Sequence, residues 1–226
     1  MSVVLFDLDG TLVDTAHDLG LALNIQLERH GKQTLSHDDI WPVASHGSAG
    51  LLALGFDITP ADDCFEAMCI EYLNLYESVF TNNAILLPGI AELLDALDMQ
   101  GIKWGIVTNK PRRFSVDLIK AVKMGNTNLH QRSACLVCGD DAAQAKPAPD
   151  TLLIACKETS TLPHDCIYVG DAERDVQAGK AAGMQTVVAL FGYIAATDKP
   201  AEWGADALIK KPSELLDCFS PASNLG

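Results

Sequence analysis

The chain has 226 residues, of which 48% are apolar and 20% are charged. This composition can build a sizeable core and excludes intrinsically disordered and collagen-like chains, and the length suits one domain with room for an insertion. With 16 Lys and Arg against 30 Asp and Glu, the formal charge is −14. Such acidity argues against nucleic acid and anionic membranes as partners, because both require a basic surface.

Seven cysteines and an amino terminus without a basic, apolar leader favour a reducing, cytoplasmic setting. Cys135 and Cys138 form a C-x-x-C, but no second pair or nearby histidine completes a metal set, so we expect both to be structural. The longest apolar run, 187–196, is about half the length that crosses a bilayer, and no membrane-spanning helix is expected.

Short, continuous apolar runs alternate with helical patterns along most of the chain. Continuous runs are typical of strands covered on both faces, and their alternation with helices predicts a doubly wound, parallel, Rossmann-like α/β sheet. The predicted strands are 3–6, 102–107, 134–137, 166–169 and 186–190. Helices are predicted from about Pro88 to Gly101, around 114–122, from about Pro149, and from about Asp175 to Gly183.

The first strand breaks this rhythm, because the segment before Pro88 is far longer than a crossover requires. Helical patterns fill it: one ends at Gly31, a second has Ser36 as its N-cap, and Pro60 opens a longer one carrying Tyr72 and Tyr76. We therefore predict a helical cap at residues 15–82, inserted into a catalytic core of residues 1–14 and 83–226.

The segment 3–11 places two carboxylates, Asp7 and Asp9, directly after a buried strand. Ligands of open α/β sheets bind at the carboxyl ends of the strands, and residues two apart in an extended chain point to the same side. Two neighbouring carboxylates suit a division of labour between a nucleophile and an acid/base. The pattern D-x-D-G-T therefore indicates a catalytic site.

The segment Asp7–Asp14 resembles the first motif of the haloacid dehalogenase-like (HAD) superfamily, whose first aspartate is the nucleophile. Thr108 and Asn109 at the end of the second predicted strand, Lys146 before Pro147, and the run from Gly170 to Asp175 resemble its later motifs, in order. The resemblance covers essentially the whole chain. One departure is Ala172, where relatives often carry a hydroxyl or carboxylate.

The resemblance implies a phosphatase that acts on a small phosphorylated metabolite. Asp7 is then the nucleophile, Asp9 the acid/base, and Thr108, Asn109 and Lys146 the phosphate-binding groups. Mg²⁺ is the expected cofactor, held by Asp7, the backbone carbonyl of Asp9 and Asp171, with support from Asp175. The cap would close over the site and select the leaving group.

Substrate choice is less defined by the sequence. Lys110, Arg112 and Arg113 follow the phosphate motif and either hold a second anionic group or lie at a helix entry. In the cap, 45–50 is expected to be a small polar loop facing the site, with His46 and Gly47 as candidate specificity residues.

Within the family the layout is similar to phosphoglycolate phosphatases, and segments near 107–111, 153–157 and 192–206 resemble N-acetylmuramic acid 6-phosphate phosphatase. A sugar-phosphate mutase similar to β-phosphoglucomutase would keep the same motifs and stays an alternative.

Other functions are disfavoured by particular residues. The D-x-D argues against a dehalogenase, and the near absence of lysine in the cap argues against a phosphonate hydrolase. A binding module on an inactive scaffold would be favoured by loss of a motif residue, and none is lost. Either a monomer or a homodimer is compatible with the sequence.

Overall fold

The computed structural model describes residues 3–219, which form a mixed α/β fold. Its main sheet, within these residues, has six parallel strands in the order β10-β9-β8-β1-β4-β7. The strands are β1 (Val3–Phe6), β4 (Lys103–Val107), β7 (Leu136–Val137), β8 (Cys166–Gly170), β9 (Gln185–Ala189) and β10 (Ala207–Ile209). The predicted parallel α/β class is confirmed.

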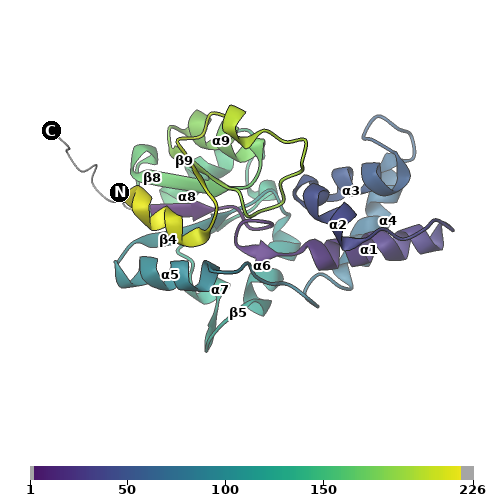
Figure 1. The fold of residues 1–226 in the computed structure, drawn as a ribbon, viewed down its shortest axis with the longest axis horizontal. Coiled ribbons are helices and arrows are strands. Elements are labelled where there is room, and N and C mark those ends of the chain that lie inside the picture. Colours follow the sequence, from purple (N-terminus) through teal and green to yellow (C-terminus); the bar gives the residue numbers. More distant parts are fainter. Residues whose placement is uncertain (1–2, 220–226) are drawn as a thin grey trace.

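Helices cover both faces of this sheet (Figure 1). Because side chains alternate along a strand, Val4 and Phe6 of β1 pack with α5 (Ile90–Met99) and α6 (Arg112–Ala121). Val3 and Leu5 face the opposite side and pack with α8 (Asp150–Thr159) and α9 (Glu173–Ala182). The strand is thus buried on both sides, as its continuous apolar sequence indicates.

A second group of helices lies at one end of the molecule and has its own apolar cluster (Figure 1). It is inserted between the two strands of a small antiparallel pair, β2 (Val13–Asp14) and β3 (Ile85–Leu86). Ser36 caps α2 by accepting a hydrogen bond from Asp39 N. The group consists of α1 (Ala16–Arg29), α2 (His37–Ile40), η1 (Trp41–His46), α3 (Gly47–Phe56) and α4 (Phe65–Glu77).

The structure differs from the sequence predictions at several places, of which four bear on the site or the main sheet. The expected loop 45–50 is the end of η1 and the start of α3, so the small residues continue a helix. The helix expected from Pro60 begins at Phe65, after a turn. The strand expected over 134–137 is reduced to β7, and β10 was not predicted because it is short and its Leu208 is exposed.

Smaller elements complete the described chain. A hairpin of β5 (Lys123–Met124) and β6 (Thr127–Asn128) precedes the short helix α7 (Leu129–Arg132). Four short 3-10 segments are η2 (Gly139–Asp141), η3 (Pro163–Asp165), η4 (Pro200–Glu202) and η5 (Pro212–Phe219). No helix within residues 3–219 combines the length and apolar character that would let it span a bilayer.

Candidate active site

Three neighbouring strands, β1, β4 and β8, end in polar residues at the same edge of the sheet. Asp7 follows β1 and still takes part in the strand ladder, since its N–H donates to Val169 O at 2.8 Å. Thr108 follows β4 in the same way and donates to Val137 O at 2.9 Å. Asp171 follows β8. The sheet thus brings together residues that lie far apart in the sequence, and all three are buried.

Lys146 lies behind Asp7, and its ammonium group connects two aspartates. Nζ is 2.9 Å from Asp7 Oδ1 and 2.7 Å from Asp175 Oδ1, and it donates to the Tyr168 hydroxyl at 2.6 Å. Burial alone would lower the pKa of Lys146, but the charges of Asp175 and Asp7 outweigh burial and raise it. Lys146 is therefore a buried cation held beside the predicted nucleophile.

Asn109 fixes the backbone of this lysine. Its Nδ2 donates to Lys146 O at 2.8 Å, and its Oδ1 accepts from Lys146 N at 2.9 Å. The side-chain amide is thus engaged with the backbone of another site residue, which gives Asn109 a positioning contact in addition to its place on the cavity wall.

Asp7, Asp171 and Asp175 form a buried acidic cluster in which one oxygen of each lies within 4.8 Å of the others. Burial raises the pKa of Asp7 against the opposing charge of Lys146, and Asp175 and Asp9 add to the rise. Burial, together with the charges of Asp7 and Asp175, raises the pKa of Asp171 to about 8. Burial and mutual repulsion thus disfavour ionisation of all three carboxyl groups together, and a divalent cation among them would favour their charged forms.

The donors of this cluster suit a hard cation. Asp7 Oδ1 accepts no well-aligned hydrogen bond from residues 3–219, although Lys146 Nζ is close. Asp171 accepts from Tyr193 N at 2.8 Å and from the Thr11 hydroxyl at 3.4 Å. Asp175 is more occupied, because its oxygens also accept from Ala172 N at 3.0 Å and from Tyr168. Asp7 and Asp171 are thus the better candidates for direct ligands, and Asp175 for a supporting group.

Gly10 allows the loop after Asp9 to approach this cluster. Its φ of +79° lies in the left-handed region, and a Cβ at this position would lie 2.3 Å from Asp171 Oδ2. Steric constraints therefore explain why the D-x-D-G-T pattern has glycine at this position.

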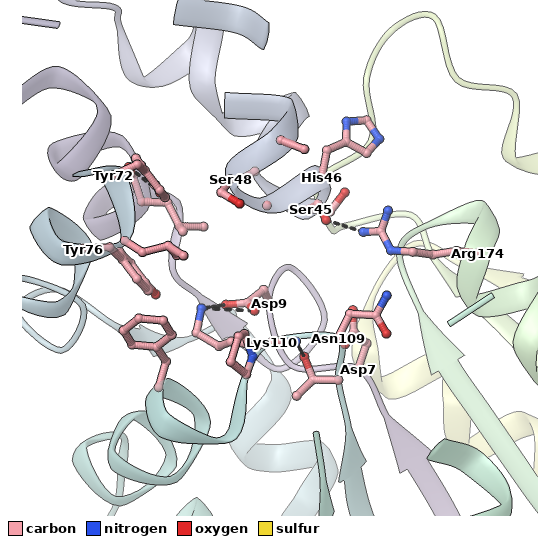
Figure 2. Close-up of a pocket in the computed structure, with 18 residues that line it drawn as sticks. Asp7, Asp9, Ser45, His46, Ser48, Tyr72, Tyr76, Asn109, Lys110 and Arg174 are labelled. Carbon is pink, nitrogen blue, oxygen red and sulfur yellow. Dashed lines mark hydrogen bonds and ion pairs between the residues drawn. The ribbon is translucent and has the colours of Figure 1, made fainter. Parts of the chain in front are cut away.

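A cavity of about 380 Å³ opens between the end of the sheet and the inserted helices. Figure 2 shows Asp9, Lys110, Asn109 and Asp7 along one wall, with Tyr72, Tyr76 and Ser48 opposite or beside them. The Asp9 carboxylate accepts from the Thr15 hydroxyl at 2.6 Å and from Lys110 Nζ at 3.0 Å. Its side chain thus faces the cavity and takes no part in the acidic cluster.

On the cap side, His46 and Gly47 line the cavity together with Ser45 and Arg174. The Arg174 guanidinium on α9 donates to Ser45 O, so it crosses from the sheet side to the inserted helices (Figure 2). Burial, with help from the Arg174 charge, lowers the pKa of His46 below its ordinary value.

Arg112 does not reach the cavity. Its guanidinium donates two hydrogen bonds to the Asp141 carboxylate and one to Leu136 O. This fork-to-carboxylate pairing raises the pKa of Arg112 and lowers that of Asp141. The neighbouring Arg113 lies over the Phe114 ring at 4.4 Å. Of the three cations that follow Asn109, only Lys110 lines the cavity.

Several residues at the site carried no predicted role. Tyr72 and Tyr76 could be assigned to one helix face by their spacing, but nothing in the sequence says what that face covers. Arg174 lies inside the last motif, and Tyr168 inside a strand that reads as purely structural. Tyr193 contacts Asp171 from the loop after β9, a juxtaposition that depends on tertiary structure.

The profile of the family described as haloacid dehalogenase-like hydrolase matches residues 4–189. The chain belongs to this family. Over 222 residues it is 37% identical to an N-acetylmuramic acid 6-phosphate phosphatase of Pseudomonas putida, covering 98% of this chain and 97% of that protein. Over 214 residues it is 39% identical to a phosphoglycolate phosphatase of Xanthomonas campestris pv. campestris, covering 95% and 94%.

Solved structures share the fold. The crystal structure of a predicted phosphoglycolate phosphatase from Haemophilus somnus superposes with a TM-score of 0.82 at 24% identity, over 97% of this chain and 98% of that one. The family and the relatives make the chain a phosphoric monoester hydrolase of the haloacid dehalogenase-like type. Enzymes of this type are generally metal-dependent, and Asp7, Asp171 and Asp175 form an acidic cluster that could hold a metal ion.

Proposed function

We propose that this protein is a Mg²⁺-dependent phosphatase that hydrolyses a small phosphate monoester through an aspartyl-phosphate on Asp7. The observation that carries the proposal is the pairing of Asp7 with Lys146 at 2.9 Å, beside an acidic cluster and below a cavity that contains Asp9. A phosphoryl group in that cavity would meet the nucleophile on one side and the acid/base on the other.

Each residue has a step in the reaction. Asp7 attacks phosphorus, while Thr108 and Lys146 hold the phosphoryl oxygens. Asp9 donates a proton to the leaving alcohol and then takes one from the water that hydrolyses the aspartyl-phosphate. A Mg²⁺ ion held by Asp7, Asp171 and the carbonyl of Asp9, with Asp175 in support, would supply neutralisation of the phosphate charge.

Residues 15–82 act in this proposal as a cap that excludes water and contacts the leaving group. The segments that enter and leave the cap are joined, because Asp18 accepts from Asn83 N at 3.0 Å and from Asn83 Nδ2 at 2.7 Å. His46 and Gly47 would contact the leaving group from the cap, whereas Arg112, held by Asp141, has no part in it. The seven free cysteines agree with a cytoplasmic enzyme.

Phosphoglycolate is the first candidate substrate, because relatives that match nearly the full chain carry that activity in their names. N-acetylmuramic acid 6-phosphate is the second. A cavity of about 380 Å³ with two tyrosines and two serines on its wall can accommodate a sugar, and two relatives are named for that substrate.

The test is release of phosphate with Mg²⁺ from both esters and from a panel of sugar phosphates. Asp7→Asn keeps nearly the same volume and should abolish turnover while the protein stays folded. A kcat/KM for one ester about a hundredfold above the rest would name the substrate. Conversion of one sugar phosphate into its isomer without release of phosphate would indicate a mutase, and turnover by pure Asp7→Asn would contradict the nucleophile.

A further inference from the structure

Lys110 is a nearly buried cation on the wall of the cavity. Its side chain is 7% exposed, and Nζ lies 3.0 and 3.3 Å from the two oxygens of Asp9. The same ammonium lies 4.7 Å from the centre of the Tyr76 ring. Among residues 3–219, Asp9 is the one acidic partner within 4 Å of this group. Because the Lys110 side chain is nearly buried and lines the cavity, solvent screens its charge poorly and a ligand in the cavity would experience it.

The position of Lys110 separates it from the phosphate-binding groups. Figure 2 shows its ammonium between Asp9 and Tyr76, on the other side of Asp9 from Asp7 and Asn109. Lys146 already supplies a cation beside Asp7. In the reaction above, Asp9 contacts the ester oxygen, so a cation beyond Asp9 faces the alcohol that leaves.

We propose that Lys110 binds a carboxylate carried by the leaving alcohol, so that the substrates are phosphate esters of hydroxy acids. The proposal rests on the function proposed above and adds the substrate class and the residue that selects it. Lys110 offers a single positive charge beside Asp9, which suits a monovalent carboxylate better than a second phosphate dianion.

Two sources of this carboxylate are compatible with the cavity. In 2-phosphoglycolate it is attached to the carbon that carries the ester oxygen. In N-acetylmuramic acid 6-phosphate it belongs to a lactyl ether on the far side of the sugar ring. The shared chemistry is an acid on the alcohol, and matched neutral esters separate the two sources.

The experiment compares kcat/KM within two pairs of esters. The first pair is 2-phosphoglycolate and its neutral amide, carbamoylmethyl phosphate. The second is N-acetylmuramic acid 6-phosphate and N-acetylglucosamine 6-phosphate, which lacks the lactyl acid. We expect one pair to show a preference for the acid of about tenfold or more, the size of one hydrogen bond to a charged group.

The variant Lys110→Met should bring that preference to within about twofold of unity, and Lys110→Arg should retain part of it. Lys120→Met removes a cation from the exposed side of the same helix α6 and is the matched control, which should keep the full preference. If Lys110→Met lowers kcat/KM equally for the acid and the neutral ester, the proposal is overturned, because Lys110 would then act only through Asp9 or the fold. A wild-type enzyme that prefers the acid in neither pair would overturn it as well.

A binding measurement keeps this result separate from the phosphatase activity. The same four esters are titrated by calorimetry into Asp7→Asn and into Asp7→Asn with Lys110→Met, with Mg²⁺ present. If an acid binds more tightly than its neutral partner and this difference disappears with Lys110→Met, the carboxylate site is supported. This holds even if no ester is hydrolysed, and only the proposed reaction is then contradicted. Binding that ignores the acid contradicts the site even where phosphate is released.

Discussion

Asp7 and Asp9 are two residues apart and occupy different environments. Asp7 is buried beside Lys146 and the other acids, a position that agrees with the attack on phosphorus proposed for it. The Asp9 side chain is 17% exposed and points into the cavity, where Thr15 and Lys110 donate to it. Repulsion between two neighbouring carboxylates already favours different roles for Asp7 and Asp9. The structure adds that each carboxylate has its own hydrogen-bond and ion-pair partners.

The variant Asp9→Asn should slow hydrolysis of an alkyl phosphate about 10²-fold or more, because the amide cannot donate a proton to the alcohol. The loss in the first step should be smaller for p-nitrophenyl phosphate, whose leaving group needs no proton. Burst kinetics with both esters measure the two steps separately. Wild-type rates with both esters would exclude an acid/base role.

Arg112 and Asp141 allow a prediction about pH. Arg112 lowers the pKa of Asp141 in the folded state, so the pair stabilises the fold above the unfolded value near 3.8 and loses this effect as the pH falls through the depressed value. Because the pair is partly exposed, Arg112→Met should cost about 1 kcal/mol or less at pH 7. Urea unfolding should show that the difference from wild type shrinks as the pH is lowered below the unfolded value near 3.8; a constant difference would be contrary evidence.

At the scale of elements, the loop after β9 joins the sheet to the first cap helix. The Tyr193 hydroxyl accepts from Thr15 N at 2.7 Å and Ala16 N at 3.0 Å, and donates to Asp14 Oδ1 at 3.1 Å. These are N–H groups at the start of α1, which would otherwise lack partners inside the helix. The ring also packs edge-on against Trp41, with centroids 4.6 Å apart.

Tyr193→Phe should therefore lower the free energy of unfolding by about 1–3 kcal/mol, since it leaves the buried Thr15 N–H without its acceptor, whereas Ala16 N keeps Asp14 Oδ1 at 3.1 Å. Hydrogen exchange at Thr15 and Ala16 should become faster in the same variant. Tyr76→Phe is the matched control, because the Tyr76 hydroxyl is buried and has no hydrogen-bond partner within residues 3–219. Equal stability of the two variants would show that the hydrogen bonds of the Tyr193 hydroxyl to the start of α1 do not stabilise the fold.

Much of the fold could be predicted because its elements are locally encoded. Continuous apolar runs marked the strands that are buried on both faces, and helical spacing marked α5, α6 and α1. Two of the elements that were missed show why. β10 is a short strand at the edge of the sheet, and α3 begins in the glycine- and serine-rich 47–50, a composition that favours loops.

In the candidate site too, some features could be predicted from the sequence and others could not. Asp7, Thr108 and Asp171 follow recognisable strands, so their convergence could be predicted from the topology. The contacts of Arg174 and Tyr193 could not, because they join segments whose distance in space depends on how the cap sits on the core. Lys110 and Arg112 show the limit most clearly: only two residues apart, one lines the cavity and the other pairs with Asp141 outside it.

For the molecule as a whole, Arg174 is a link between the sheet and the inserted helices. Its contact with Ser45 O lies where the main cavity meets a second one lined by Asp171 and Trp203. Loss of this link should let the inserted helices move more freely over the cavity.

We expect Arg174→Met to give faster hydrogen exchange in η1 and a kcat/KM about tenfold lower, because the cap would position the leaving group less well. Lys180→Met, an exposed cation on the same helix α9, should change neither quantity. Unchanged exchange in η1 of Arg174→Met would show that other contacts hold the two parts together.

The central place of β1 also has a consequence for how the molecule is made. β1 pairs with β4 on one side and β8 on the other, and these begin at Lys103 and Cys166, after all the inserted helices. During synthesis β1 emerges first and stays without its neighbours, whereas the inserted helices pack mainly on one another and have all emerged before β4 is made. The acidic cluster is completed by residues after β8 and is thus among the last features to form, so the activity proposed above would have to wait until most of the chain has been synthesised.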